Sequence, residues 1–319
     1  MLTYKEKLCF WGLVAYPNLN DQQLSEKINL KRSTITSIRN KLIKNNFFKT
    51  LYVPNLSQLN CEMVSILFGS LKNQDYEDVF EKITKSSSVI YANFSKTKFF
   101  IIFAENNYSS FLSNCYNCLD ILEEKNMLKH YSYVNFPLSI SNVHNFLDFS
   151  NILKNLYNLE VNSDKVDFKT NKLKLTKKEK LVFKHLVANP NETDTFISQN
   201  TDVARPTISS IRKKLIQNGF LTASRIPTFT KLPFELLVLS HVKLKNNNSD
   251  WFNKNLNFLA LANKRNGFSL GLYKEYKDSF DILSEQSLFK SEPNELLFSL
   301  NEPYKEKISF TELINQAFK

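Results

Sequence analysis

Residues 32–47 read RSTITSIRNKLIKNNF, and residues 205–220 read RPTISSIRKKLIQNGF. The likeness extends beyond these stretches. Residues 5–54 align with residues 178–227 without a gap, at a constant offset of 173, and nearly half of the aligned positions are identical. An internal repeat of this length indicates that one structural unit has been duplicated. We therefore expect the chain to contain two copies of one plan.

The positive charge of the chain is concentrated in the two repeated segments. The whole chain has 319 residues, a length that suggests more than one domain, and a formal net charge of +11. Residues 1–50 and 174–225 each carry a net charge of +6, whereas residues 51–173 carry −2 and residues 226–319 carry +1. Charge confined in this way is expected of two surfaces that bind a polyanion.

Composition also limits the class of protein. Hydrophobic residues make up 42% of the chain, which is enough for several cores, and no apolar run is long enough to span a membrane. The N-terminus does not have the order of a signal peptide, so we expect a cytoplasmic protein without a membrane partner. Cys115 and Cys118 form a C-x-x-C pair without further ligands nearby, so all four cysteines are expected to be reduced, buried thiols. No metal and no cofactor is predicted.

The repeated segment has the pattern of a helix-turn-helix. Apolar spacing predicts helices over residues 5–16, from Asp21 to about residue 28, and over residues 32–45. Ile35, Ile38 and Leu42 fall on one face of the third helix, and a short turn precedes it. Residues 47–54 and 220–227 are rich in strand formers and are predicted to be wings.

The remainder of each half predicts the order βαββαβ, which is ferredoxin-like. In the first half the expected elements are 63–71, 76–85, 88–94, 98–105, 109–124 and 128–134. In the second half they are 236–244, 251–255, 258–263, 267–273, 276–284 and 296–300. Residues 146–159 are predicted to be helical, and residues 161–174 a linker. The predicted fold class is α+β, a tandem duplication in which each half is a winged helix-turn-helix followed by a ferredoxin-like βαββαβ domain.

We expect five parts along the chain. The predicted boundaries are a first winged helix-turn-helix at 1–56, a first βαββαβ domain at 57–145, a connecting helix and linker at 146–173, a second winged helix-turn-helix at 174–229 and a second βαββαβ domain at 230–319.

This plan resembles the leucine-responsive regulator (Lrp/AsnC) family, a resemblance carried by Leu24-Ser25, by Ser33-Thr34-Ile35 and by the run from Phe47 to Leu59. The resemblance implies a DNA-binding transcriptional regulator. This chain differs from the family in having two units in one chain. The Gly-Asp-rich loop that helps many members to bind an amino acid is replaced by residues 93–98 and 263–267, which argues against a small-molecule effector of that kind.

The third helix of each copy supplies the predicted DNA-binding residues. Its N-terminal half is expected to face base edges in the major groove, and Asn40 could pair with adenine and Lys213 with guanine. Arg32, Arg205, Lys41 and Lys214 are expected to contact phosphate at the rim. For Arg39 and Arg212 the sequence leaves packing, a salt bridge and DNA contact open. The predicted DNA-binding set is Arg32, Ser33, Thr34, Thr36, Ser37, Asn40, Lys41, Lys44, Arg205, Pro206, Thr207, Ser209, Ser210, Lys213 and Lys214.

The sequence is compatible with several alternatives. The predicted partner is double-stranded DNA, with the transcription machinery as a further partner, and the βαββαβ domains can pair as a homodimer or as an intrachain pseudo-dimer. A replication initiator or another tandem winged-helix protein, including one that binds protein, would share the same plan. Some proteins with this plan decarboxylate siroheme and rely on histidines. Because the four histidines here do not recur at equivalent positions and nucleotide loops and nucleophile motifs are absent, we expect no enzyme.

Overall fold

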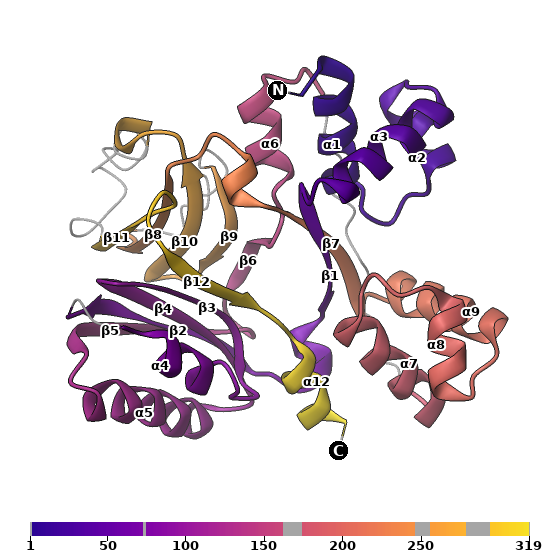
Figure 1. Ribbon diagram of the computed structural model, residues 1–319. Helices are drawn as coiled ribbons and strands as arrows, with labels where there is room; N and C mark the ends of the chain where they lie inside the picture. The colour runs from indigo at the N-terminus through magenta and orange to yellow at the C-terminus, as the bar shows by residue number, and fades with distance from the viewer. Residues whose placement is uncertain (1, 73–74, 162–173, 246–255, 279–293, 319) are drawn as a thin grey trace. The chain divides into compact units, whose positions relative to one another are not determined.

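The computed structural model describes residues 2–72, 75–161, 174–245, 256–278 and 294–318. Both predicted helix-turn-helix segments are present (Figure 1). The first consists of α1 (Tyr4–Ala15), α2 (Asp21–Ile28) and α3 (Arg32–Lys44), and the second of α7 (Lys177–Ala188), α8 (Asp194–Thr201) and α9 (Arg205–Gln217). Each first helix begins with a complete capping box, at Thr3–Glu6 and at Thr176–Glu179. Equivalent residues therefore start equivalent helices.

The first half contains the predicted βαββαβ domain. Its elements are β2 (Met63–Leu71), α4 (Glu77–Ile83), β3 (Val89–Ser95), β4 (Lys98–Glu105), α5 (Tyr108–Glu124) and β5 (Leu128–Pro137), and α4 and α5 cover one face of the sheet (Figure 1). Apolar side chains from these strands and helices, including Leu67, Phe103, Phe111 and Leu122, form one buried cluster. The strand order β3-β4-β2-β5, antiparallel throughout, is the ferredoxin-like order.

The second half repeats the sheet with β8 (Leu236–Lys243), β9 (Asn257–Ala262), β10 (Asn266–Tyr273) and β11 (Asn294–Ser299) in the order β11-β8-β10-β9. The predicted helix at 251–255, and most of the one at 276–284, lie outside the described residues. The fold class is the predicted one: a tandem α+β duplication of helix-turn-helix and ferredoxin-like sheet. No helix in the described part of the chain is long and apolar enough to cross a membrane.

The chain forms two compact units, and neither unit is one half of the sequence. Unit 1 contains residues 1–51, 143–167 and 223–301, and unit 2 contains residues 52–142, 168–222 and 302–319. Unit 1 thus combines the first helix-turn-helix with the second sheet, whereas unit 2 combines the second helix-turn-helix with the first sheet. The halves have exchanged their helix-turn-helix segments within a single chain.

The predicted wings are single strands, and each pairs with the equivalent strand of the other copy. β1 (Phe48–Pro54) and β7 (Leu221–Pro227) form a two-stranded sheet. In unit 1 the amide of Thr228 donates to the carbonyl of Phe47, and in unit 2 the amide of Asn55 donates to the carbonyl of Phe220. A lone strand leaves its backbone groups unpaired, and the repeated strand supplies an equivalent partner.

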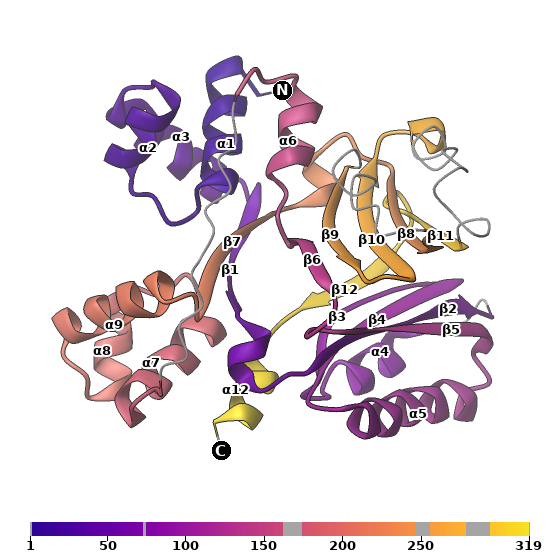
Figure 2. The same cartoon turned by 180° about the vertical axis from the view of Figure 1, so that it is seen from behind.

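Each sheet also receives a fifth strand that was not predicted, and a helix follows each of these strands. In unit 1, β6 (Asn142–Phe146) lies beside β9, and α6 (Ser150–Tyr157) packs beside α1 (Figures 1 and 2). In unit 2, β12 (Tyr304–Ile308) pairs with β3, and α12 (Thr311–Ala317) packs beside α7. The helix predicted over 146–159 is α6, which begins four residues later because Phe146 is the last residue of β6.

Candidate nucleic-acid interface

The third helix of each helix-turn-helix is held by one apolar stripe. Ile35, Ile38 and Leu42 of α3 are buried, and so are the equivalent Ile208, Ile211 and Leu215 of α9. Each stripe packs on the two preceding helices. The opposite face of each helix is exposed, as predicted.

An ion pair joins the second helix to the third in both copies. The guanidinium of Arg39 lies 2.6 Å from the carboxylate of Asp21, which also accepts a hydrogen bond of 2.6 Å from the hydroxyl of Thr36. In unit 2, Arg212 lies 2.6 Å from Asp194, which accepts from the hydroxyl of Ser209. Arg39 and Arg212 thus form salt bridges that position the third helix. The exposed Thr36 and Ser209 are engaged in the same network.

A second ion pair joins the first helix to the third. The ammonium group of Lys41 lies 2.5 Å from Glu6 in unit 1, and that of Lys214 lies 2.5 Å from Glu179 in unit 2. These hydrogen bonds lower the pKa of both glutamates below the ordinary value. The two lysines predicted to contact phosphate therefore already have a carboxylate partner within the protein. Their partners were not predicted, although Glu6 and Lys41 are identical in both copies, and this was the signal that could have revealed them.

The remaining predicted residues form an exposed polar face on each helix. On α3, Arg32, Ser33, Ser37, Asn40 and Lys44 are exposed and have no ion-pair partner among the described residues, and Thr34 is half-buried. On α9, the equivalent face consists of Arg205, Pro206, Thr207, Ser210 and Lys213. Each unit therefore brings the predicted residues of one helix together on one surface.

The N-terminus of each third helix differs from those of the two preceding helices. No side chain caps the first backbone amides of α3 or α9, whereas the other two helices of each helix-turn-helix are capped by Thr or Asn. Uncapped amides and the positive end of the helix dipole favour a phosphate oxygen. Arg32 and Arg205, at the first position of each helix, add a guanidinium that matches phosphate geometry.

The exposed faces of α3 and α9 differ in the middle of each helix. Asn40 of α3 is replaced by Lys213 in α9, and Lys44 is replaced by Gln217. An amide and an ammonium group present different hydrogen-bond patterns to base edges.

The four cysteines are free and buried, as predicted. Burial raises the pKa of the thiols of Cys9 and Cys118 to about 12, so both are protonated at neutral pH. Cys115 and Cys118 lie on the core side of α5.

Comparison with solved structures finds similarity along nearly the whole chain. The fold is that of the siroheme decarboxylase NirDL. That crystal structure covers 99% of this chain, and 97% of its own chain is covered, with a TM-score of 0.54 and 12% identity. E. coli AsnC (13% identity, TM-score 0.35) and B. subtilis LrpC (16% identity, TM-score 0.34) each align with 43% of this chain, over 92% and 94% of their own chains. No family model and no curated protein matches the sequence.

The prediction that the chain is not an enzyme was wrong. It was based on the absence of nucleotide loops, of nucleophile motifs and of histidines at repeated positions. A solved structure that covers 99% of this chain, that of the siroheme decarboxylase NirDL, is nevertheless an enzyme. The absence of those motifs therefore does not separate this fold from catalysis.

Proposed function

We propose that this chain binds double-stranded DNA sequence-specifically through α3 and α9 and acts as a transcriptional regulator. The observation that carries this proposal is the pair of exposed third-helix faces, each with an uncapped N-terminus and an arginine at its first position. A recognition helix enters the major groove with its N-terminal residues toward the bases. Phosphate would be held by Arg32, Arg205 and the helix N-termini, and bases would be contacted by Ser37, Asn40, Ser210 and Lys213.

Salt dependence tests the electrostatic part of the proposal. Duplexes selected from random DNA should bind with an affinity whose logarithm falls linearly with the logarithm of salt concentration, by about 0.9 per phosphate neutralised. The double variant Arg32→Ala/Arg205→Ala should bind more weakly to all sequences and show a slope smaller by about two. The matched control is Lys125→Ala/Lys264→Ala, which removes the same charge from exposed positions outside both helix-turn-helix segments. Equal slopes for the two double variants would contradict the proposal.

Footprinting tests the reading of bases. Asn40→Ala and Lys213→Ala should each weaken protection of a different half of a selected site, at a cost of about 1–3 kcal/mol. The reason is that the exposed faces of α3 and α9 carry different side chains, whereas their buried faces carry the same apolar residues. Loss of both halves together, or a strictly palindromic selected site, would show that the two helices do not read independently.

A second candidate function follows from the full-length match: decarboxylation of a siroheme-type tetrapyrrole. Decarboxylation breaks a carbon–carboxylate bond, releases carbon dioxide and places a proton on the carbon that remains, so it needs a proton source. His241 on β8 is half-buried beside Asn266 (3.3 Å), and burial lowers its pKa, so its imidazole is neutral at neutral pH. A neutral imidazole can relay a proton.

Anaerobic incubation of the whole chain with siroheme, followed by mass spectrometry of the tetrapyrrole, tests this second function. Loss of carboxyl groups that persists in Arg32→Ala/Arg205→Ala and falls in His241→Ala would support it. An unchanged tetrapyrrole, with no shift of its visible absorption on addition of protein, would exclude this substrate.

A further inference from the structure

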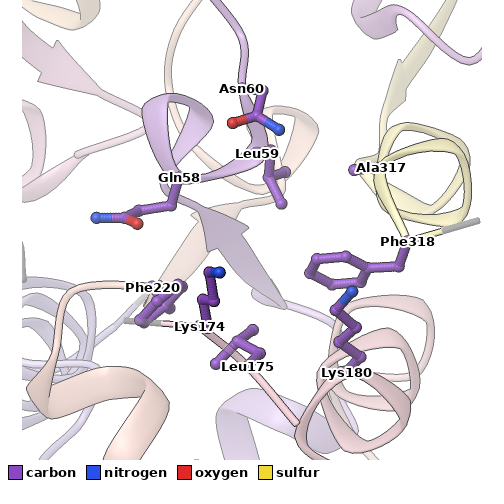
Figure 3. Close-up of a pocket in the computed structure, with 9 residues that line it drawn as sticks. All are labelled: Gln58, Leu59, Asn60, Lys174, Leu175, Lys180, Phe220, Ala317 and Phe318. Carbon is purple, nitrogen blue, oxygen red and sulfur yellow. The ribbon is translucent and has the colours of Figure 1, made fainter. Parts of the chain in front are cut away.

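We infer that unit 2 contains a binding site for a small aromatic carboxylate, at a hollow beside the second helix-turn-helix. The hollow has a volume of about 440 Å³, within the size range of small-molecule sites. Every residue that lines it belongs to unit 2. Its walls come from the short helix η1 (Leu56–Leu59) and Asn60, from the start of α7, from Phe220 and from the end of α12 (Figure 3).

The lining combines two ammonium groups with two aromatic rings. Lys174 and Lys180 both line the hollow, and no acidic residue does. The ammonium of Lys180 lies 5.3 Å from the ring centre of Phe318, a cation–π contact, and forms no ion pair within the described part of the chain. An anion that enters would therefore find positive charge that no side chain in the lining neutralises.

The apolar part of the site is fixed in place. Phe318 packs edge-on against the buried Phe183 of α7, with ring centres 5.3 Å apart, and Phe220 and Leu59 are buried. Figure 3 shows the ring of Phe318 next to Lys180, with Leu59 and Asn60 above them. Aromatic and aliphatic walls next to ammonium groups suit a flat apolar body that carries a carboxylate.

The equivalent region of unit 1 places a lysine and a phenylalanine against one aromatic ring, as unit 2 does. Lys7, the counterpart of Lys180, lies 5.4 Å from the ring centre of Tyr157. Phe10 packs there against Phe47, Phe48 and Tyr157, with ring centres 5.9, 6.1 and 6.5 Å apart. The position of Phe48 is occupied in the second copy by Leu221, which is smaller. The two regions thus differ in the side chain at this position.

No residue that lines the site belongs to α3 or α9, and the inference does not depend on DNA binding. Residues of α7, η1 and the end of α12 line the hollow. A bound ligand would therefore contact all three and stabilise the packing of the second helix-turn-helix against the rest of unit 2. The ligand would act there as an effector.

The test uses the whole chain, with benzoate as the probe, in calorimetry and ligand-observed NMR. Benzoate should bind, and Lys174→Met/Lys180→Met should weaken binding by about tenfold or more, since methionine keeps the apolar stem without the charge. The matched control Lys7→Met removes the equivalent lysine of unit 1 and should leave binding unchanged. Lys174 is exposed, so Lys174→Met alone keeps the test open if the double variant does not fold.

Two further probes define the ligand class. Benzyl alcohol retains the ring without the charge, and inorganic phosphate retains charge without the ring, so both should bind more weakly than benzoate. The inference is overturned if either binds as tightly as benzoate, if benzoate does not bind, or if Lys7→Met weakens binding as much as the double variant does.

Discussion

Glu6 and Glu179 each hold two parts of their helix-turn-helix at once. As the third residue of a capping box, each accepts a hydrogen bond from the backbone amide that precedes its helix. Each also accepts a hydrogen bond from a lysine of the third helix, Lys41 or Lys214. Neither glutamate is exposed, whereas the lysines keep 58% and 45% of their side-chain surface. The pair is therefore partly screened by solvent and contributes modestly to stability.

This arrangement predicts a specific dependence on pH. The folded-state pKa of both carboxyls is below the ordinary value of 4.5, so their contribution is present above that pH and is lost as the pH falls through the folded-state pKa. Glu6→Gln/Glu179→Gln keeps the capping box but removes the charge, and should cost about 0.5–1 kcal/mol per site at neutral pH. Unfolding followed from neutral pH down to about pH 3 should show the difference from the natural protein shrinking.

Glu26→Gln is the matched control, since Glu26 is exposed and lies in the same helix-turn-helix. Its unfolding curve should stay parallel to that of the natural protein. A difference for the double variant that remains constant over the whole range would mean that the ion pairs do not shift the two pKa values.

Arg225 is a buried charge that contacts the first helix-turn-helix within unit 1. Its guanidinium donates to the carbonyls of Leu13 and Pro17 at the end of α1, the second at 3.0 Å, and lies over the ring of Phe48. The equivalent residue in the first copy is Tyr52, whose hydroxyl accepts a hydrogen bond from Arg212 in unit 2. Arg225→Met leaves two carbonyls without their charged donor and should cost about 2–4 kcal/mol.

Hydrogen exchange shows which part of the chain loses stability in Arg225→Met. Amides of α1 should exchange faster in Arg225→Met, while those of α7 should not change. Arg265→Met, an exposed arginine of the same unit, should leave both unchanged. Equal acceleration in α1 and α7 would show that Arg225 does not act on unit 1 alone.

At the scale of elements, the last strand and helix of the chain complete unit 2. β12 pairs with β3 in antiparallel register, the hydroxyl of Tyr91 donates to Glu306 at 2.7 Å, and Lys307 donates to the carbonyl of Thr84 at 2.7 Å. Phe318 then packs on Phe183 of α7. These contacts cover β3, which would otherwise be an edge strand.

A chain ending at residue 302 should therefore lose protection in unit 2. Amides of β3 should exchange at least about tenfold faster, because their partner strand is gone. Amides of β9 in unit 1 are the internal control, since the corresponding strand β6 remains. Unchanged exchange in β3 would show that β12 adds nothing to the stability of the sheet.

At the scale of the whole molecule, the exchange of helix-turn-helix segments makes each half depend on the other. Residues 1–160 alone contain a helix-turn-helix, a sheet, β6 and α6, but the helix-turn-helix and the sheet belong to different units. Expressed alone, this half should form a homodimer in which each copy donates its helix-turn-helix, β6 and α6 to the sheet of the other. Light scattering at about 10 μM should give the mass of a dimer. A folded monomer would contradict the exchange.

Much of the local structure was predictable from the sequence. The stripe of Ile35, Ile38 and Leu42 and its repeat in the second copy determine the third helices, because helix faces are set by residues three and four apart. The alternating and continuous apolar runs located the strands of both ferredoxin-like sheets. The exposed residues of the candidate interface followed from the same periodicity.

Only the tertiary structure decided which parts pack together. β6 and β12 have five residues each, too few to be recognised from their pattern, and their partners are far away in the chain. The ion pair of Glu6 and Lys41 joins residues that are 35 positions apart in the chain. The two helix-turn-helix segments have nearly the same buried stripe, so the stripe does not indicate which sheet each segment packs with. Sequence periodicity reports which face of an element is buried, because that depends on neighbouring residues. The choice of the element that covers it depends on contacts between distant segments, and these are specified only when the whole chain has folded.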